Sequence, residues 1–168
     1  MEIEIRKGGR EHTEALISLL REVWEQMEHK EWFFLDDPED VRQMMADGTM
    51  ELWVAMDGDR LAGAFDMLIP GLHSWNYGYD LGFSQEELLR VINMDTAAVH
   101  PDYRGLGLQK KLLETAEEEI RNRGKHILLC TVHPENRFSL NNVQKMGYTI
   151  QKELPKYGSV RYVLRKDI

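Results

Sequence analysis

The residues from Arg104 to Lys111 have the types and the spacing that suit binding of an anion. Gly105 and Gly107 allow a tight corner between a strand and a helix, and backbone N–H groups at a helix start lack partners within the helix. The helix dipole favours acids at this end, so the cations Arg104, Lys110 and Lys111 are best explained by a bound anion such as a phosphate. Solvation is the alternative for the two lysines, and the sequence leaves it open.

Two common phosphate-binding motifs do not fit this corner. A Walker loop ends in Gly-Lys-Ser or Gly-Lys-Thr, and the chain contains neither. A dinucleotide fingerprint requires a third glycine three residues after Gly107, where this chain has Lys110. The corner therefore belongs to another kind of phosphate site.

The chain reads Ala97-Ala98-Val99-His100-Pro101 and then Arg104-Gly105-Leu106-Gly107-Leu108. This order resembles motif A of the GNAT N-acetyltransferase superfamily, in which a strand ending in a small residue and valine precedes a glycine-rich corner with arginine or glutamine. Gln109 stands in the last motif position, where the family usually has glycine or alanine. Its backbone N–H is still available, so the departure changes little.

The stretch from Asn136 to Tyr148 resembles motif B of the same family. Asn136, Ser139, Gly147 and Tyr148 match the family pattern. Val143 departs from it, because many members carry a tyrosine there that protonates the departing thiolate of coenzyme A, and valine cannot donate a proton. Each motif alone is common, so the resemblance rests on their order and spacing.

The resemblance implies an α+β fold over a single domain, residues 1–168. The sheet would be GNAT-like, mixed and mostly antiparallel, with helices on both faces and a central parallel pair of strands, Val91–Val99 and Ile127–Val132, that splay apart. Acetyl-CoA, the co-substrate, would enter the gap, with pantetheine on one strand edge and pyrophosphate on the corner. The residues implied to bind it are Ala97, Ala98, Val99, Arg104, Gly105, Leu106, Gly107, Leu108, Gln109, Lys110, Asn136 and Ser139.

The implied reaction is direct attack of a primary amine on the thioester, and a free amine with a pKa near ~10 needs a base to take its proton. Asp95 is the first candidate, because a charge within an apolar strand is costly unless it is paired or functional. Its alternative is a structural hydrogen bond. His133 is the second candidate, and its alternative is to orient the turn before Pro134.

Two functions from different classes follow. The first is an acetyl-CoA-dependent N-acetyltransferase that acts on a small amine or an amino acid, with Trp24–Phe34 and Trp75–Phe83 lining the acceptor pocket. The second is a non-catalytic acyl-CoA sensor, which Val143 favours. The acceptor, the acyl group, the general acid and the oligomeric state are left open, with a homodimer as one option.

The composition limits the kinds of partner that we expect for this protein. The net charge is −8, from 29 acidic and 21 basic residues, which argues against nucleic acid. One cysteine excludes an internal disulfide, and Cys130 lies in an apolar run that suggests packing. The six histidines show no metal-ligand spacing. No apolar run is long enough for a membrane span or a signal peptide, so we expect no membrane partner and a cytoplasmic location.

Periodicity and turn residues predict the elements that must position these groups. Helices are expected from Glu11, from an Asp37-Pro38 start, from a Ser84 capping box, from Leu108 to Arg123, and from Asn136 to Gly147. The expected strands are Glu2–Arg6, Glu51–Met56, Arg60–Ile69, Val91–Val99, Lys125–Val132, Tyr148–Leu154 and Val160–Arg165, with a turn over 155–158. The aromatic loop over 70–83 either lines a site or covers the sheet edge.

Overall fold

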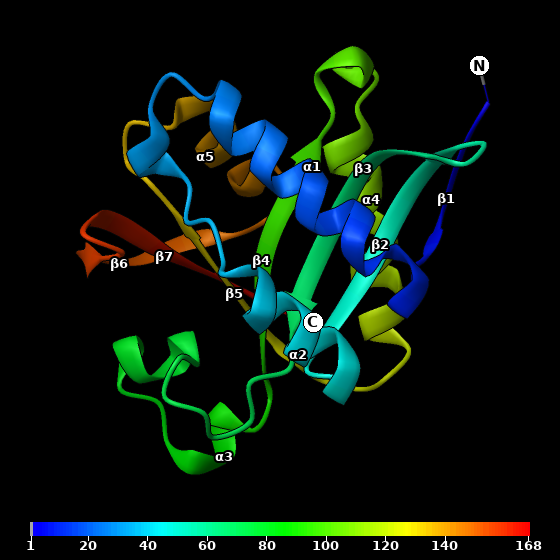
Figure 1. The fold of residues 1–168 in the computed structure, drawn as a ribbon. Coiled ribbons are helices and arrows are strands. Elements are labelled where there is room, and N and C mark those ends of the chain that lie inside the picture. Colours follow the sequence, from blue (N-terminus) through cyan, green and yellow to red (C-terminus); the bar gives the residue numbers. More distant parts are fainter. Residues whose placement is uncertain (1) are drawn as a thin grey trace. The chain divides into compact units, whose positions relative to one another are not determined.

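A computed structural model describes residues 2–168 (Figure 1). The strands are β1 (Ile3–Lys7), β2 (Met50–Asp57), β3 (Arg60–Leu68), β4 (Val91–Val99), β5 (Ile127–Val132), β6 (Thr149–Lys156) and β7 (Ser159–Asp167). The α-helices are α1 (Thr13–Gln26), α2 (Pro38–Asp47), α3 (Gln85–Leu88), α4 (Leu108–Arg121) and α5 (Arg137–Lys145). Short 3-10 turns include η3 (Tyr77–Leu81) and η4 (Pro101–Tyr103).

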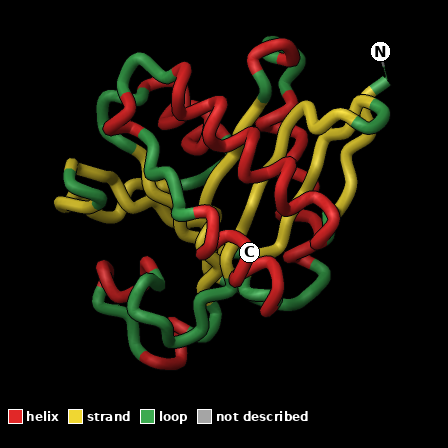
Figure 2. The backbone as a smooth tube through the Cα atoms, in the orientation of Figure 1, coloured by secondary structure: helices red, strands yellow, loops and turns green. Residues whose placement is uncertain are grey.

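The strands, which are yellow in Figure 2, form one sheet. They are hydrogen-bonded in the order β1-β2-β3-β4-β5-β7-β6, and β4 with β5 is the parallel pair. This is the mixed, mostly antiparallel α+β sheet that the sequence predicts. The chain forms two compact units, one of residues up to Leu68 with Thr96–Glu119, and one of Ile69–Asp95 with Ile120–Ile168. Because β4 and α4 each run through both units, this division leaves the single domain over residues 1–168 a prediction.

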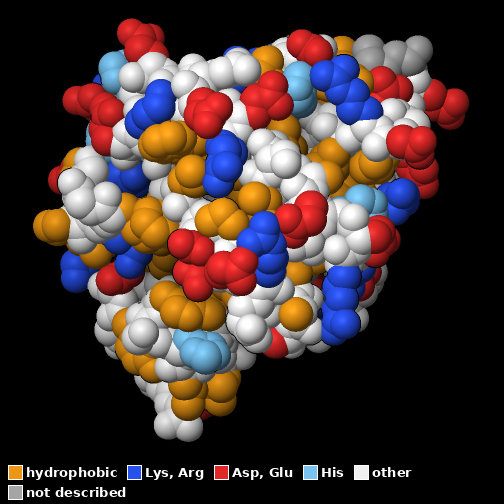
Figure 3. Space-filling view, in the orientation of Figure 1, with side chains coloured by type: hydrophobic (Ala, Val, Ile, Leu, Met, Phe, Trp, Pro, Cys, Tyr) orange, Lys and Arg blue, Asp and Glu red, His pale blue; other side chains and the backbone are white. Residues whose placement is uncertain are grey.

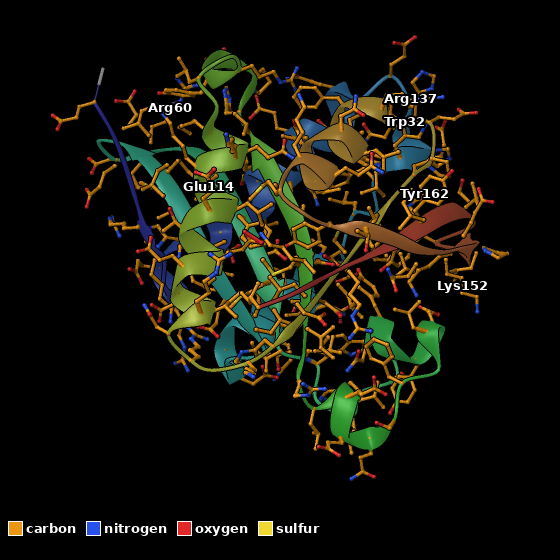
Figure 4. The ribbon with its side chains drawn as sticks, turned by 180° about the vertical axis from the view of Figure 1, so that it is seen from behind. Trp32, Arg60, Glu114, Arg137, Lys152 and Tyr162 are labelled. Carbon is orange, nitrogen blue, oxygen red and sulfur yellow. The ribbon has the colours of Figure 1, made fainter. Side chains whose placement is uncertain are left out.

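The first unit contains β1, β2, β3 and the second half of β4, with helices on both faces. Helix α1 buries Leu16, Leu19 and Leu20, which fall on one stripe at helical spacing. Figures 1 and 4 show α1 and α4 on opposite faces of β2 and β3. The predicted stripe of α4 is confirmed, because Leu108, Leu112, Ala116 and Ile120 are at most 3% exposed.

The second unit contains the first half of β4, then β5, β7 and β6. A small core beside the loop over 69–90 is formed by Tyr77, Val91, Ile127 and Leu129. The aromatic loop therefore buries at least Tyr77, and its capping box at Ser84 starts α3 as predicted. Cys130 is buried on β5, in agreement with a packing role.

The C-terminal hairpin differs from the sequence prediction. We expected a turn over 155–158, but β6 continues through Pro155, which pairs with Val160, and the turn consists of Tyr157 and Gly158 alone. Proline is tolerated because β6 is the edge strand, where a missing N–H removes no ladder bond. The irregular segment over 70–83 also contains the turn η3.

On the face drawn in Figure 3, acidic and basic side chains are interspersed. Within residues 2–168, no helix combines the length and apolar character that a membrane span requires.

The contribution of the Asp37 cap of α2 to stability can be tested by mutation. Asp37 accepts a hydrogen bond from Glu39 N at 2.8 Å, and Pro38 follows as the first helical residue. We expect Asp37→Ala to lower the free energy of unfolding by about 1 kcal/mol. Asp37→Asn, which keeps a capping oxygen, should stay near the wild type in urea unfolding. Equal losses in both variants would contradict a capping role.

Candidate active site

The predicted anion corner lies in the first unit, between β4 and α4. Gly105 and Gly107 have φ values of 84° and 70°, a left-handed conformation that glycine adopts without strain. The first hydrogen bond at the start of α4 runs from Lys111 N to Gly107 O, at 3.1 Å. Across residues 2–168, no protein acceptor binds the backbone N–H groups of 105–110. These exposed donors at the positive end of a helix dipole can bind an anion.

The β2–β3 hairpin holds this corner in place. Tyr103 donates its hydroxyl to Asp57 Oδ2 at 2.5 Å, and Arg60 binds Asp102 at 2.9 Å while its guanidinium lies 5.2 Å from the Tyr103 ring. The hydrogen bond to Asp57 raises the pKa of the Tyr103 phenol, so the phenol remains a donor at neutral pH. His100 N also donates to Ala62 O on β3, at 2.8 Å.

The sequence did not predict Asp57, Arg60 or Tyr103 as supports of the corner. Their partners lie more than 40 residues away in the chain, so no local pattern signals the contacts. His100 belongs to the turn before Pro101, because its Nδ1 accepts from Asp102 N at 3.1 Å. Lys110 lies 3.7 Å from Glu114, an i,i+4 pair that supports the solvation alternative for this lysine.

The end of β4 presents an edge that is directed away from β3. His100 N donates to β3, and the Ala98 carbonyl oxygen lies 3.2 Å from a Cβ built on Gly63 of that strand. Because successive residues of a strand direct their N–H and C=O groups to opposite edges, Ala97 and Val99 direct theirs away from β3. In the second unit, the parallel register of β4 with β5 covers Val91 to Asn93 and, among the described residues, does not extend to Met94 or Asp95.

Asp95 lies in the second unit and accepts a hydrogen bond from a buried tyrosine. The Tyr77 hydroxyl is 3.0 Å from Asp95 Oδ1 and 2.8 Å from the Tyr157 hydroxyl, and Tyr77 is 3% exposed. Burial, followed by the negative charge of Asp95, raises the pKa of the Tyr77 phenol well above its usual value. Tyr77 is therefore a neutral donor to the carboxylate of Asp95.

Further charged side chains lie beside these tyrosines. Lys156 Nζ lies 5.2 Å from the Tyr77 ring and 5.4 Å from the Tyr157 ring, and it forms a 2.8 Å ion pair with Asp80. The guanidinium of Arg161 is 5.6 Å from the Tyr157 ring. Sequence reasoning missed Tyr157, because only the structure shows that the turn consists of Tyr157 and Gly158, both with positive φ.

His133 forms a hydrogen bond within the turn that it begins. The side chain is 6% exposed, and its Nδ1 accepts from Glu135 N at 3.1 Å. This supports the alternative that His133 orients the turn before Pro134, and its role as a base stays a prediction. Asn136 caps α5 by accepting from Ser139 N at 3.3 Å, so their roles in cofactor binding also stay predictions. No cluster of His, Cys, Asp and Glu in the described part of the chain could hold a metal ion.

A glycine corner between a central strand and α4 is the feature on which the comparison with known proteins can be made. The sequence model of the acetyltransferase (GNAT) family matches residues 13–148, and the chain belongs to this family. The fold is also close to the crystal structure of Arabidopsis thaliana NAA60 in complex with acetyl-CoA, with a TM-score of 0.77, 15% identity and 99% of each chain covered.

Two curated relatives have names that specify an acceptor. The L-amino acid N-acyltransferase MnaT of Escherichia coli (strain K12) is 36% identical over 61 residues, which is 36% of this chain and 36% of that protein. An L-methionine sulfoximine/L-methionine sulfone acetyltransferase of Salmonella typhimurium is 33% identical over 60 residues, 36% of this chain and 35% of that protein. The match spans only about a third of the length of these relatives.

The raised pKa of Tyr77 predicts a pH dependence of stability. The unfolded phenol ionises near pH ~10, whereas the folded phenol keeps its proton to higher pH, so its contribution is complete below ~10 and is lost as pH rises further. Above pH ~10 the wild type should lose up to about 1.4 kcal/mol of unfolding free energy per pH unit more than Tyr77→Phe. Urea unfolding from pH 8 to 11 measures this, with Tyr162→Phe as a control that keeps the wild-type slope. Parallel curves for Tyr77→Phe and the wild type would contradict it.

Proposed function

We propose that this protein transfers an acetyl group from acetyl-CoA to the primary amine of a small molecule, with an amino acid as the acceptor class. The observation that carries the proposal is the run of backbone N–H groups at 105–110, which have no protein acceptor in the described chain. A diphosphate supplies the acceptors that these donors lack. The names of the two curated relatives support an amino acid as the acceptor.

The first unit offers two complementary binding features for the acetyl donor. The corner would hold the pyrophosphate through the backbone N–H groups of Gly105 to Lys110, with Arg104 exposed beside them. The edge of β4 at Ala97 and Val99 would pair with the amide groups of pantetheine as an added strand does. Both features are made of backbone, so the side chains of Leu106 and Gln109 can vary without loss of the contacts.

The reaction needs two protons removed from the nitrogen and one bond exchanged. Asp95 would take the first proton from the acceptor ammonium, and the amine nitrogen would then bond to the acetyl carbon. The nitrogen would lose its second proton to water as the carbon–sulfur bond breaks. The Val99 N–H, directed away from β3, would stabilise the oxyanion. The thiolate leaves with the bonding electron pair, and because its pKa is near ~8.5, water can protonate it.

A non-catalytic acyl-CoA sensor is the second candidate, because Val143 occupies the place of the family tyrosine. Release of free thiol from acetyl-CoA over a panel of L-amino acids and alkylamines distinguishes the two. Amine-dependent thiol release above hydrolysis supports the enzyme. Tight acetyl-CoA binding without any amine-dependent release would support the sensor.

A negative side chain at the corner should weaken the binding of coenzyme A. In Gly107→Glu a carboxylate would stand at the anion site. The φ of 70° strains the new residue, but no neighbouring atom lies within 4 Å of an added Cβ, so the chain should still fold. We expect binding of coenzyme A in calorimetry to weaken by at least ~100-fold, which is about 2.7 kcal/mol. Gly48→Glu is the matched control, because Gly48 also has an open left-handed conformation, at the end of α2. Equal affinities in the two variants would contradict a diphosphate site at this corner.

Removal of the proposed base should lower kcat and leave the affinity for coenzyme A unchanged. Asp95→Asn keeps the shape of the side chain but cannot accept a proton from an ammonium group. We expect kcat to fall by roughly 10²–10⁴-fold, while coenzyme A affinity stays within about twofold of the wild type. Stopped-flow thiol detection and calorimetry measure the two quantities. A wild-type kcat would remove Asp95 from the mechanism.

A further inference from the structure

A row of three hydroxyl and carboxyl groups connects the tip of the β6–β7 hairpin to β4. Tyr157 lies in the hairpin turn, Tyr77 lies in η3, and Asp95 lies on β4, all in the second unit. The two hydrogen bonds of the row measure 2.8 Å and 3.0 Å and join residues 80 and 18 positions apart in the chain. The row is therefore a tertiary feature that three separate segments build.

The direction of the hydrogen bonds follows from the number of protons. An ionised Asp95 only accepts, so the single proton of the Tyr77 hydroxyl is donated to Asp95. Tyr77 then has only its lone pairs for Tyr157, and the Tyr157 hydroxyl must be the donor in that pair. Such a chain polarises each member towards the carboxylate, which strengthens both bonds.

The backbone of Tyr157 has a conformation that residues other than glycine rarely adopt. Its φ is 56° and that of Gly158 is 71°, the pattern of a two-residue type I′ turn, in which asparagine before glycine is preferred. Tyr157 is the one residue other than glycine with positive φ in the described chain, 2–168. A bulky residue in this conformation is strained, and such strain persists at functional sites.

We propose that Tyr77 and Tyr157 are positioning residues for Asp95, which hold its carboxylate in the ionised, proton-accepting state and fix its orientation for the acceptor amine. The inference rests on the proposed role of Asp95 as the base. Tyr157 is 37% exposed, so the outer end of the row meets solvent, whereas Tyr77 is buried.

The charged groups around the row come from the same unit. Lys156 lies near both tyrosine rings and is paired with Asp80, and Arg161 faces the Tyr157 ring from β7. Loss of the hydroxyl of Tyr77 leaves these ion pairs and ring contacts in place. Tyr77→Phe therefore removes both hydrogen bonds of the row, whereas Tyr157→Phe removes only the outer one.

The experiment compares Tyr77→Phe and Tyr157→Phe with Tyr162→Phe, a half-exposed tyrosine on β7 (Figure 4). Without its donor, the carboxylate of Asp95 should bind protons more readily. The acidic limb of the kcat/KM profile should move to higher pH by about one unit in Tyr77→Phe and by less in Tyr157→Phe. It should not move in Tyr162→Phe. An unmoved limb in Tyr77→Phe, whatever its thermal stability, would overturn the proposal.

A second readout does not depend on activity. The ¹³C carboxyl resonance of Asp95, assigned by its loss in Asp95→Asn, should titrate at higher pH in Tyr77→Phe than in the wild type. If the wild type releases no thiol, the proposed function fails, and this titration still decides whether Tyr77 controls the carboxylate. Identical titration curves would reject the inference while leaving the enzyme assay intact.

The strain at Tyr157 has its own test. Tyr157→Asn relieves the strained backbone but removes the hydroxyl, whereas Tyr157→Phe keeps the strain. We expect Tyr157→Asn to unfold at a temperature equal to or above that of Tyr157→Phe, with the pH limb displaced in both. A lower unfolding temperature for Tyr157→Asn would contradict a strained tyrosine held for function.

Discussion

Backbone N–H groups without protein acceptors are the constraint on which this structure depends. Buried or helical amides are normally paired, so a run of free donors at 105–110 of the described chain exists only where solvent or a ligand binds them. The glycines at 105 and 107 make the corner possible, and the hairpin contacts of Arg60 and Tyr103 keep it from rearranging. A preorganised array of N–H groups of this kind would bind an anion without a further cost of ordering.

The sequence predicted the elements that follow local rules. The cap at Asp37, the capping box at Ser84, the apolar stripe of α4 and the bounds of β4 all depend on residues within one or two helical turns or one strand. The glycine corner was predictable for the same reason, because its glycines and the helix that follows are contiguous. The geometry of the corner thus follows from local sequence, and its role as the acetyl-CoA site stays a proposal.

The surroundings of Asp95 were not predictable in the same way. Tyr77 and Tyr157 contact each other across 80 residues, and neither belongs to a motif. The register of the last hairpin decided the contact, because β6 continues through Pro155 and leaves only Tyr157 and Gly158 in the turn. A turn over 155–158, as the sequence suggested, would place Tyr157 at a different position relative to the strands.

Under the proposed mechanism, this row would matter more than the missing tyrosine at position 143. Proton removal from an alkylamine, with a pKa near ~10, is the demanding transfer, whereas a thiolate with a pKa near ~8.5 leaves without help. A base is useful only while it is ionised and correctly oriented, and the Tyr77 hydroxyl would secure both conditions for Asp95. The absence of a general acid at position 143 would therefore slow the reaction less than loss of the hydrogen bond to Asp95. The strained turn at Tyr157 is consistent with this priority, because it maintains the outer end of that hydrogen-bonded row.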